Sequence, residues 1–332
     1  MSALNEDFQP PPPPLETETR APRPTKLRPV AVAIFVIGLI VLVLGITKIM
    51  PGGVSTGAML CLVGVVLAAF SFIPLPAIKE TEAPLPFFAK VTGIFYEPAR
   101  VFRNLRDHPH WLGAFAVIAV LSLVYTFAFV QRITPERIVD HITSRLSELG
   151  SFAPPPDQID KIKDAQLAEF KNPIQRVGST VRAVCGLFLL GVFTAAVCLL
   201  GVLVFGGTIN YWQSLAVVFY YWLPVMIIQK VLGLLILFLK SPEDLHPILN
   251  QETTLQDNLS ILVSSAEHPV LYVVLSFIGL TWFYLIWLRA KGLRNGGTKV
   301  SNGAAWGVSI MLYVVLMIAI SVWSSLFSGF IS

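Results

Sequence analysis

Long apolar blocks separated by polar connections dominate the hydrophobic pattern of the chain. Each block runs for about 20 residues with few or no charges, which is the helix length that crosses the hydrocarbon core of a bilayer. A soluble core would not need so many blocks of this kind. The pattern therefore predicts an all-α, polytopic transmembrane helical bundle. The predicted spans, about seven in number, cover residues 30–50, 54–73, 111–130, 180–205, 212–240, 269–288 and 304–327.

The first two spans are predicted to form an N-terminal transmembrane hairpin over residues 30–73. A proline and two glycines at positions 51–53 have the composition of a tight turn. Small residues in the second span recur at spacings of three and four, so they share one helix face to which another helix can pack closely. These residues are Gly53, Gly57, Cys61 and Gly64.

Residues 1–29 form a polar tail ahead of the first span. A run of five prolines, from Pro10 to Pro14, cannot continue a helix and favours polyproline II or disorder. Two interpretations stand. The tail is either simply solvated, or its proline run docks into an aromatic groove of a partner protein.

Two short amphipathic helices are predicted over residues 79–110, and Pro98 suits the first turn of the second one. Apolar and basic faces on short helices are typical of elements that lie in the membrane interface. Packing of the helices on the bundle is the alternative. The first apolar face is predicted to hold Phe87, Phe88, Val91, Ile94 and Phe95, with Lys90 and Glu97 opposite; the second is predicted to hold Val101, Phe102 and Leu105.

Residues 131–178 and 240–267 are predicted to be exposed helical connections. In the first, Thr134 is followed by a proline and a glutamate, which is the composition of a helix start. In the second, Thr254 and Asp257 are predicted to cap a short helix. The apolar residues expected on that helix are Leu255, Leu259 and Leu262.

Basic residues near the span ends predict the orientation. The connections over 79–110 and 289–303 lie on the same side as the N-terminal tail and are rich in Lys and Arg. The positive-inside rule then places the N-terminus in the cytoplasm and the C-terminus on the opposite side. The net charge of +4 is attributed to this asymmetry and not to nucleic-acid binding. The basic residues expected at the interface are Arg100, Arg103, Arg106, Arg289, Lys291 and Arg294.

Little in the sequence points to catalytic chemistry. Charged residues make up 13% of the chain, and none of the predicted spans contains Asp or Glu. Cys61, Cys185 and Cys198 lie in apolar runs, where free cysteine behaves as a small hydrophobe. His108 and His110 flank a proline, but two ligands do not make a metal site. We expect no enzymatic activity, no cofactor and no metal.

The fifth predicted span is distinguished by a strongly polar pair well inside its apolar run. A lysine at such a position is costly and marks a functional site or a partner by default. Lys230 would bind an anion or a lipid headgroup in a cavity. The alternatives are that it extends to the interface, or that a helix break at Pro224 leaves it shallower. The candidate polar membrane site comprises Pro224, Gln229, Lys230, Tyr220 and Tyr221.

The order of these features resembles the Yip (Ypt/Rab-interacting protein) domain family of membrane proteins, in its bacterial branch. The resemblance covers about residues 87–328, and its parts carry it jointly by their order and spacing. They are the sequence FYEPARVF at 95–102, HPHW at 108–111, Gly206-Gly207, WQSLA at 212–216, Pro224 and WFYLIWLRAKGL at 282–293.

The resemblance implies a five-span bundle over residues 111–328 with a cytoplasmic N-terminus and no known catalytic residues. It also implies a bacterial inner-membrane location. Eukaryotic relatives act in vesicle traffic and bind small GTPases, a role that does not transfer readily to this chain. The hairpin over residues 30–73 is an addition ahead of the family domain.

Two functions remain open at this point. The first is a non-enzymatic integral membrane protein that organises or shapes membrane and binds lipid or protein partners, including other copies of itself. The second is a permease or channel-like transporter with a cavity near Pro224 and Lys230. The absence of carboxylates from the spans favours the first, although an anion carrier would not need them.

Overall fold

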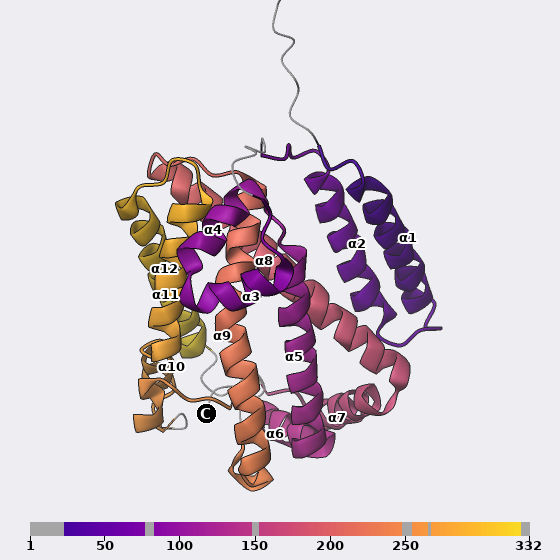
Figure 1. The fold of residues 1–332 in the computed structure, drawn as a ribbon. Coiled ribbons are helices and arrows are strands. Elements are labelled where there is room, and N and C mark those ends of the chain that lie inside the picture. The colour runs from indigo at the N-terminus through magenta and orange to yellow at the C-terminus, as the bar shows by residue number, and fades with distance from the viewer. Residues whose placement is uncertain (1–22, 77–82, 148–152, 248–253, 265–266, 327–332) are drawn as a thin grey trace, which may run out of the picture.

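The computed structural model describes residues 23–76, 83–147, 153–247, 254–264 and 267–326. These residues form helices joined by turns and short loops, and no strand occurs among them. The predicted all-α polytopic bundle is confirmed (Figure 1). The proline run of the tail lies outside the described residues.

Six helices of the described chain are long and apolar enough to cross a membrane. They correspond to six of the seven predicted spans. The sixth predicted span, residues 269–288, is not formed by a single helix of this length. The six helices are α1 (Leu27–Ile46), α2 (Gly53–Phe70), α5 (Leu112–Ile133), α8 (Pro173–Val204), α9 (Tyr211–Leu239) and α12 (Asn302–Leu326).

The hairpin of α1 and α2 packs backbone against backbone, as its glycine pattern predicts. A Cβ atom added at Gly57 would lie 2.4 Å from the backbone nitrogen of Leu42, and one at Gly45 would lie 2.2 Å from that of Val54. The hairpin is tied to α8 by Arg182, which donates a hydrogen bond to the Thr56 hydroxyl at 2.9 Å. Only glycine allows α1 and α2 to approach this closely.

Helix α9 occupies the centre of the bundle, between α5 and α8 on one side and α11 on the other (Figure 1). Every residue from Trp212 to Tyr221 is buried. Asn210 caps the helix by accepting a hydrogen bond from the Trp212 backbone N–H at 2.9 Å. Gly191 of α8 makes room for this packing, because a Cβ atom there would lie 2.4 Å from the Phe219 ring.

The sixth predicted span is not one helix but two, α10 (Pro269–Ser276) and α11 (Leu280–Gly296). Both pack along α12. Tyr313, in the middle of α12, donates a hydrogen bond to the carbonyl oxygen of Phe277 at the break, at 2.8 Å. The break therefore lies level with the middle of a membrane-length helix.

A distant segment fills the break between α10 and α11. The Asp257 carboxylate accepts a hydrogen bond from the Thr281 backbone N–H at 2.6 Å, and the Leu259 N–H donates to the Ile278 carbonyl at 3.0 Å. A Cβ atom at Gly279 would lie 2.8 Å from that of Asn258. The prediction that Asp257 caps a helix of its own segment was wrong: it caps α11, and a short 3-10 helix, η3 (Leu259–Leu262), follows Asn258.

Two short helices, α3 (Phe87–Tyr96) and α4 (Pro98–Asp107), cover one end of the bundle. The stripe Val101, Phe102 and Leu105 of α4 is fully buried against the bundle. The apolar face predicted for α3 is divided, because Ile94 is fully buried whereas Phe88 is 79% exposed, and Lys90, predicted on the opposite side, is 3% exposed. Helix α3 thus presents aromatic rings outward at the edge of the bundle.

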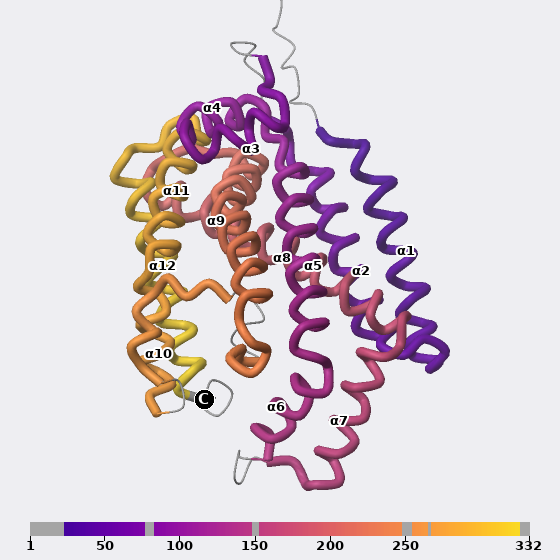
Figure 2. The backbone as a smooth tube through the Cα atoms, turned by 60° about the horizontal axis from the view of Figure 1, so that its bottom comes forward, coloured from indigo at the N-terminus to yellow at the C-terminus, as the bar shows by residue number. Residues whose placement is uncertain are grey.

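The opposite end of the bundle carries α6 (Pro135–Ser147) and α7 (Pro156–Lys171), as Figure 2 shows. They pack against each other, and Lys163 forms an ion pair with Asp140 at 2.6 Å. The Arg137 guanidinium donates hydrogen bonds to backbone carbonyls of the segment after α9, including that of Glu243 at 3.1 Å. That segment includes the 3-10 helix η2 (Pro242–Asp244).

Candidate functional site

Lys230 of α9 lies inside the bundle with 4% of its surface exposed. Its Nζ atom is 4.7 Å from the centre of the Tyr125 ring of α5, which is a cation–π geometry. The side chain therefore does not extend to the membrane interface. Helix α9 is also continuous through Pro224, so a break there does not make Lys230 shallower.

The remaining candidates on α9 do not gather around Lys230. Lys230 is nine positions after Tyr221, which places the two side chains on opposite faces of a helix. The ring of Tyr221 instead lies under the guanidinium of Arg289 from α11, at 5.1 Å. Tyr220 is buried and Gln229 is half-buried. The sequence-predicted polar site thus divides into a Lys230–Tyr125 contact and an Arg289–Tyr221 contact.

Arg289 was predicted at the interface, but its side chain is buried with 5% of the residue exposed. It donates a long hydrogen bond of 3.4 Å to the carbonyl oxygen of Ser309 in α12. Lys291, two residues later, is half-buried on another face of α11. Arg289 and Lys291 point in different directions around α11, so Arg289 lies inside the bundle and Lys291 does not.

Three of the predicted interfacial cations meet in one cleft of about 390 Å³, here called the basic cleft. Arg100 and Arg103 come from α4, and Lys291 comes from α11. The other two behave differently: Arg106 pairs with Asp107 at 3.1 Å, and Arg294 donates to the Asn302 side chain at 3.2 Å. The remaining residues around the basic cleft are Tyr96, Glu97, Pro98, Ala99 and Trp287.

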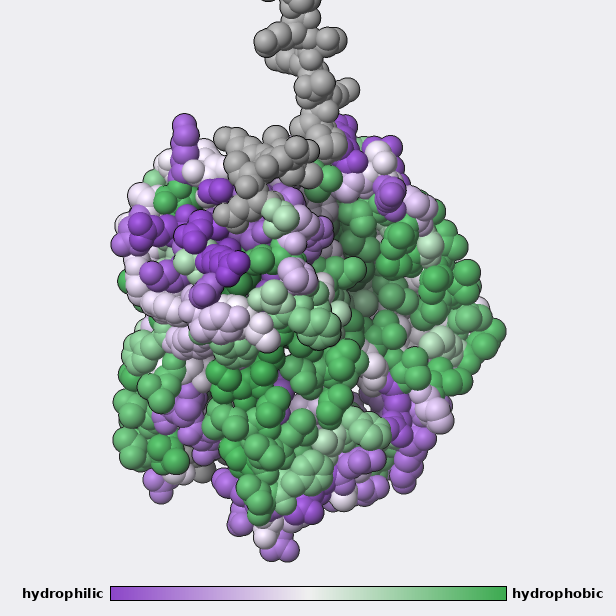
Figure 3. Space-filling view, viewed as in Figure 1, coloured by the Kyte–Doolittle hydropathy of each residue, from purple (hydrophilic) through white to green (hydrophobic). Residues whose placement is uncertain are grey.

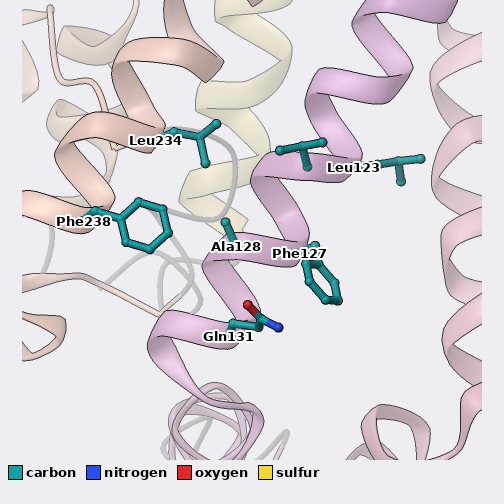
Figure 4. A pocket seen from close by; sticks show the side chains of 7 residues that line it. Leu123, Phe127, Ala128, Gln131, Leu234 and Phe238 are labelled. Carbon is teal, nitrogen blue, oxygen red and sulfur yellow. The ribbon is translucent and has the colours of Figure 1, made fainter.

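Two further clefts are almost wholly apolar and lie on the sides of the bundle. The larger, of about 520 Å³, lies between α5 and α9 and is lined by Leu123, Phe127 and Ala128 of α5 and by Leu234 and Phe238 of α9; in Figure 4 Ala128 lies on the side of α5 towards α9. Gln131 is its one polar lining residue among those described. The smaller, of about 440 Å³, is lined by Phe87, Gly113, Ala116, Val117, Val120 and Leu121.

Metal chemistry finds no support among the described residues, since no group of three His, Cys, Asp or Glu side chains is positioned to hold an ion. The rings of His108 and His110 stack with their centres 6.3 Å apart. Burial, then the charges of Lys90 and His108, lowers the pKa of His110. These histidines form the turn between α4 and α5.

A second pair of histidines lies at the α6–α7 end. The rings of His141 and His246 meet edge to face at 4.8 Å. Burial, followed by the charges of His141, Arg145 and Arg137, lowers the pKa of His246 to about 4. The folded protein therefore holds this histidine neutral at a pH where an unfolded chain would protonate it.

We expect the protein to lose stability as the pH falls from about 6.5 towards 4. In that window the unfolded chain binds a proton at His246 that the folded chain does not bind, so acid favours unfolding. Melting curves of the purified protein at successive pH values measure the effect. A His246→Gln variant should show a shallower decline, whereas His268→Gln, an exposed histidine on the same side, should follow the parent. Parallel declines in all three proteins would contradict the assignment.

The fold and its apolar surface define a class, that of integral membrane proteins that cross the bilayer several times. Within that class, a family model described as the Yip1 domain matches residues 92–324. The chain therefore belongs to the Yip1 domain family. No curated protein and no solved structure matches the chain.

Proposed function

We propose that this Yip1 domain protein is non-enzymatic and organises or shapes the membrane by binding lipids and protein partners around its bundle. The observation that carries the proposal is the placement of the clefts. All three described clefts lie on the outside of the bundle, and two have apolar walls of the kind that accept acyl chains. Phe127 and Phe238, which line the cleft between α5 and α9, are more than half exposed.

The distribution of helices outside the spans supports the same proposal. Helices α3 and α4 cover one end with exposed aromatic and basic side chains, whereas α6 and α7 at the other end are charged. Amphipathic elements held at one leaflet occupy area there and not in the opposite leaflet. We propose that the α3–α4 end faces the cytoplasm of a bacterial cell, in agreement with its excess of Lys and Arg.

A permease is the second candidate, and the α10–α11 break favours it. Helices interrupted near the middle of the bilayer are common in transporters, where the half-helix ends bind substrate or ions. Asp257 reaches the end of α11 at this depth, and Lys230 is buried in α9. A transporter needs a water path to these groups, whereas a membrane organiser does not.

Water accessibility along α9 separates the two candidates. Single cysteines from Tyr220 to Leu235 would be placed in a cysteine-free background and treated in membranes with an impermeant thiol reagent. We expect no labelling in this stretch and full labelling of Ser241→Cys, an exposed position beyond the helix end. Labelling around Lys230 that an added anion suppresses would overturn the proposal in favour of a permease.

The shape of reconstituted vesicles tests the organising role itself. Purified full-length protein would be inserted into vesicles at increasing ratios of protein to lipid, and vesicle diameters would be measured by electron cryomicroscopy. We expect the diameter distribution to narrow and shift to smaller values as the ratio rises. Diameters equal to those obtained with an unrelated seven-span protein of matched size would refute membrane shaping.

A further inference from the structure

The basic cleft exists because α4 lies against α11 at close range. A Cβ atom at Gly292 of α11 would lie 3.1 Å from the ring of Phe102 in α4, so glycine permits this approach. Trp287 and Lys291 are four residues apart and share a face of α11 beside the contact. Arg100 and Arg103 of α4 lie three residues apart on the facing edge. Four side chains from two distant parts of the sequence thus surround one hollow.

The charge of the basic cleft is net positive. Glu97 is its one acid, and it pairs with Arg100 at 3.1 Å, with both side chains at least half exposed. Such an exposed pair contributes little stability, so the guanidinium is able to exchange its partner. No ion pair involves Arg103 or Lys291 within the described part of the chain. Two cations therefore remain for a ligand.

The basic cleft lies at the boundary between apolar and polar surface. The rings of Tyr284 and Trp287 stack with centres 5.8 Å apart, and Lys291 follows one turn further towards the end of α11. Aromatic belts of this type sit at the level of the lipid headgroups. In Figure 3 hydrophilic residues gather around α4, above an apolar surface. On α11, Leu280 and Phe283 are exposed on the apolar side of the aromatic pair.

We infer that the basic cleft between α4 and α11 binds the phosphate-bearing headgroup of an anionic phospholipid. Arg103 and Lys291 contact the phosphate, Arg100 exchanges Glu97 for it, and Trp287 and Tyr96 flank the glycerol region. Guanidinium groups bind phosphate oxygens in pairs, and cations near an anionic leaflet gain from its surface potential. Free phosphate shares this chemistry, but it has no apolar part to contact the aromatic pair or the apolar surface below. The headgroup site rests on the proposed function and extends it, because it names the class of lipid that is bound.

The test is a lipid titration of purified full-length protein in neutral detergent. The probes are a short-chain phosphatidylglycerol, a short-chain phosphatidylcholine and inorganic phosphate, and the readout is the lipid-dependent rise in melting temperature. An Arg103→Gln/Lys291→Gln variant removes the two available cations. The matched control, Arg294→Gln/Lys299→Gln, removes the same charge from exposed positions at the same end of the bundle.

We expect the parent to bind phosphatidylglycerol in preference to phosphatidylcholine. The cleft variant should bind it about 30-fold more weakly, and the control variant within about twofold of the parent. Equal weakening in both variants would show diffuse attraction and overturn the site. Binding of inorganic phosphate with no preference among lipids would overturn the lipid assignment.

The headgroup site and the proposed membrane-shaping function can fail independently of each other. Because Arg103, Arg294 and Lys299 are exposed and Lys291 is half-buried, both variants should melt like the parent in the absence of lipid. If the parent shows no preference for phosphatidylglycerol but still reduces vesicle diameters, the headgroup site alone is refuted. Retained lipid preference with no effect on vesicle diameter would leave the site intact and refute membrane shaping.

Discussion

An Asp257→Ala variant is expected to lose about 2 kcal/mol of stability. The Asp257 carboxylate accepts a hydrogen bond from the Thr281 N–H at the first turn of α11, and its backbone carbonyl accepts one from Leu280 at 3.3 Å. At the middle of a bilayer no water replaces a lost acceptor, so an unpaired N–H there is expensive. The negative charge also favours the N-terminal end of the α11 dipole. Unfolding followed by tryptophan fluorescence in detergent measures the loss.

Two control variants make this result specific to the helix break. Asp257→Asn keeps an oxygen acceptor and removes the charge, so it should lose less than half as much stability as the alanine variant. Asp244→Ala removes an exposed acid from η2 in the same connection and should melt like the parent. If Asp257→Ala and Asp244→Ala melt alike, Asp257 does not hold the broken span together.

The location of six membrane-length helices follows from hydrophobic length alone, but the break in the sixth predicted span does not. Residues 269–288 are apolar on both sides of Gly279, so nothing local interrupts the pattern. The break is stabilised by Asp257 and Leu259, about 20 residues upstream, which supply hydrogen bonds that the helix would otherwise supply itself. The two segments touch at Gly279, and this glycine is the local sequence feature that reflects the contact.

The apolar face predicted for α3 divides between two environments that both favour apolar residues. One side of this helix packs on the bundle through Ile94, and the other turns Phe88 outward at the edge of the bundle. A periodic pattern shows which residues share a side but not which side faces the bundle. Lys90 therefore ended in the interior, where burial lowers its pKa.

The sequence identified the individual residues of the candidate sites, but it did not show which of them lie together in the folded protein. The sequence singled out Lys230, and its burial follows from its position in the central helix. Arg289 and Lys291 are two residues apart, about 200° around a helix, so one enters the bundle and the other reaches the basic cleft. That cleft joins α4 to α11 across roughly 190 residues of chain, and only packing brings them together.

A Gly57→Leu variant is expected to lose about 3 kcal/mol of stability, at the upper end for overpacking. The nearest neighbours of the added Cβ atom would be backbone atoms of α1, at Leu42 and at the carbonyl oxygen of Gly38. Backbone atoms cannot move aside as a flexible side chain can, so α1 and α2 must separate. Melting temperature in detergent measures the loss.

Gly186→Leu is the matched control for the expected separation of α1 and α2 in the Gly57→Leu variant. Gly186 also lies in a membrane-length helix, α8, but a Cβ atom there would meet nothing within 4 Å. The same gain in volume should therefore leave the melting temperature close to that of the parent, with better helix propensity than glycine. Equal melting temperatures for both variants would mean that α1 and α2 do not touch through their backbones, and the close hairpin ahead of the Yip1 domain would be refuted.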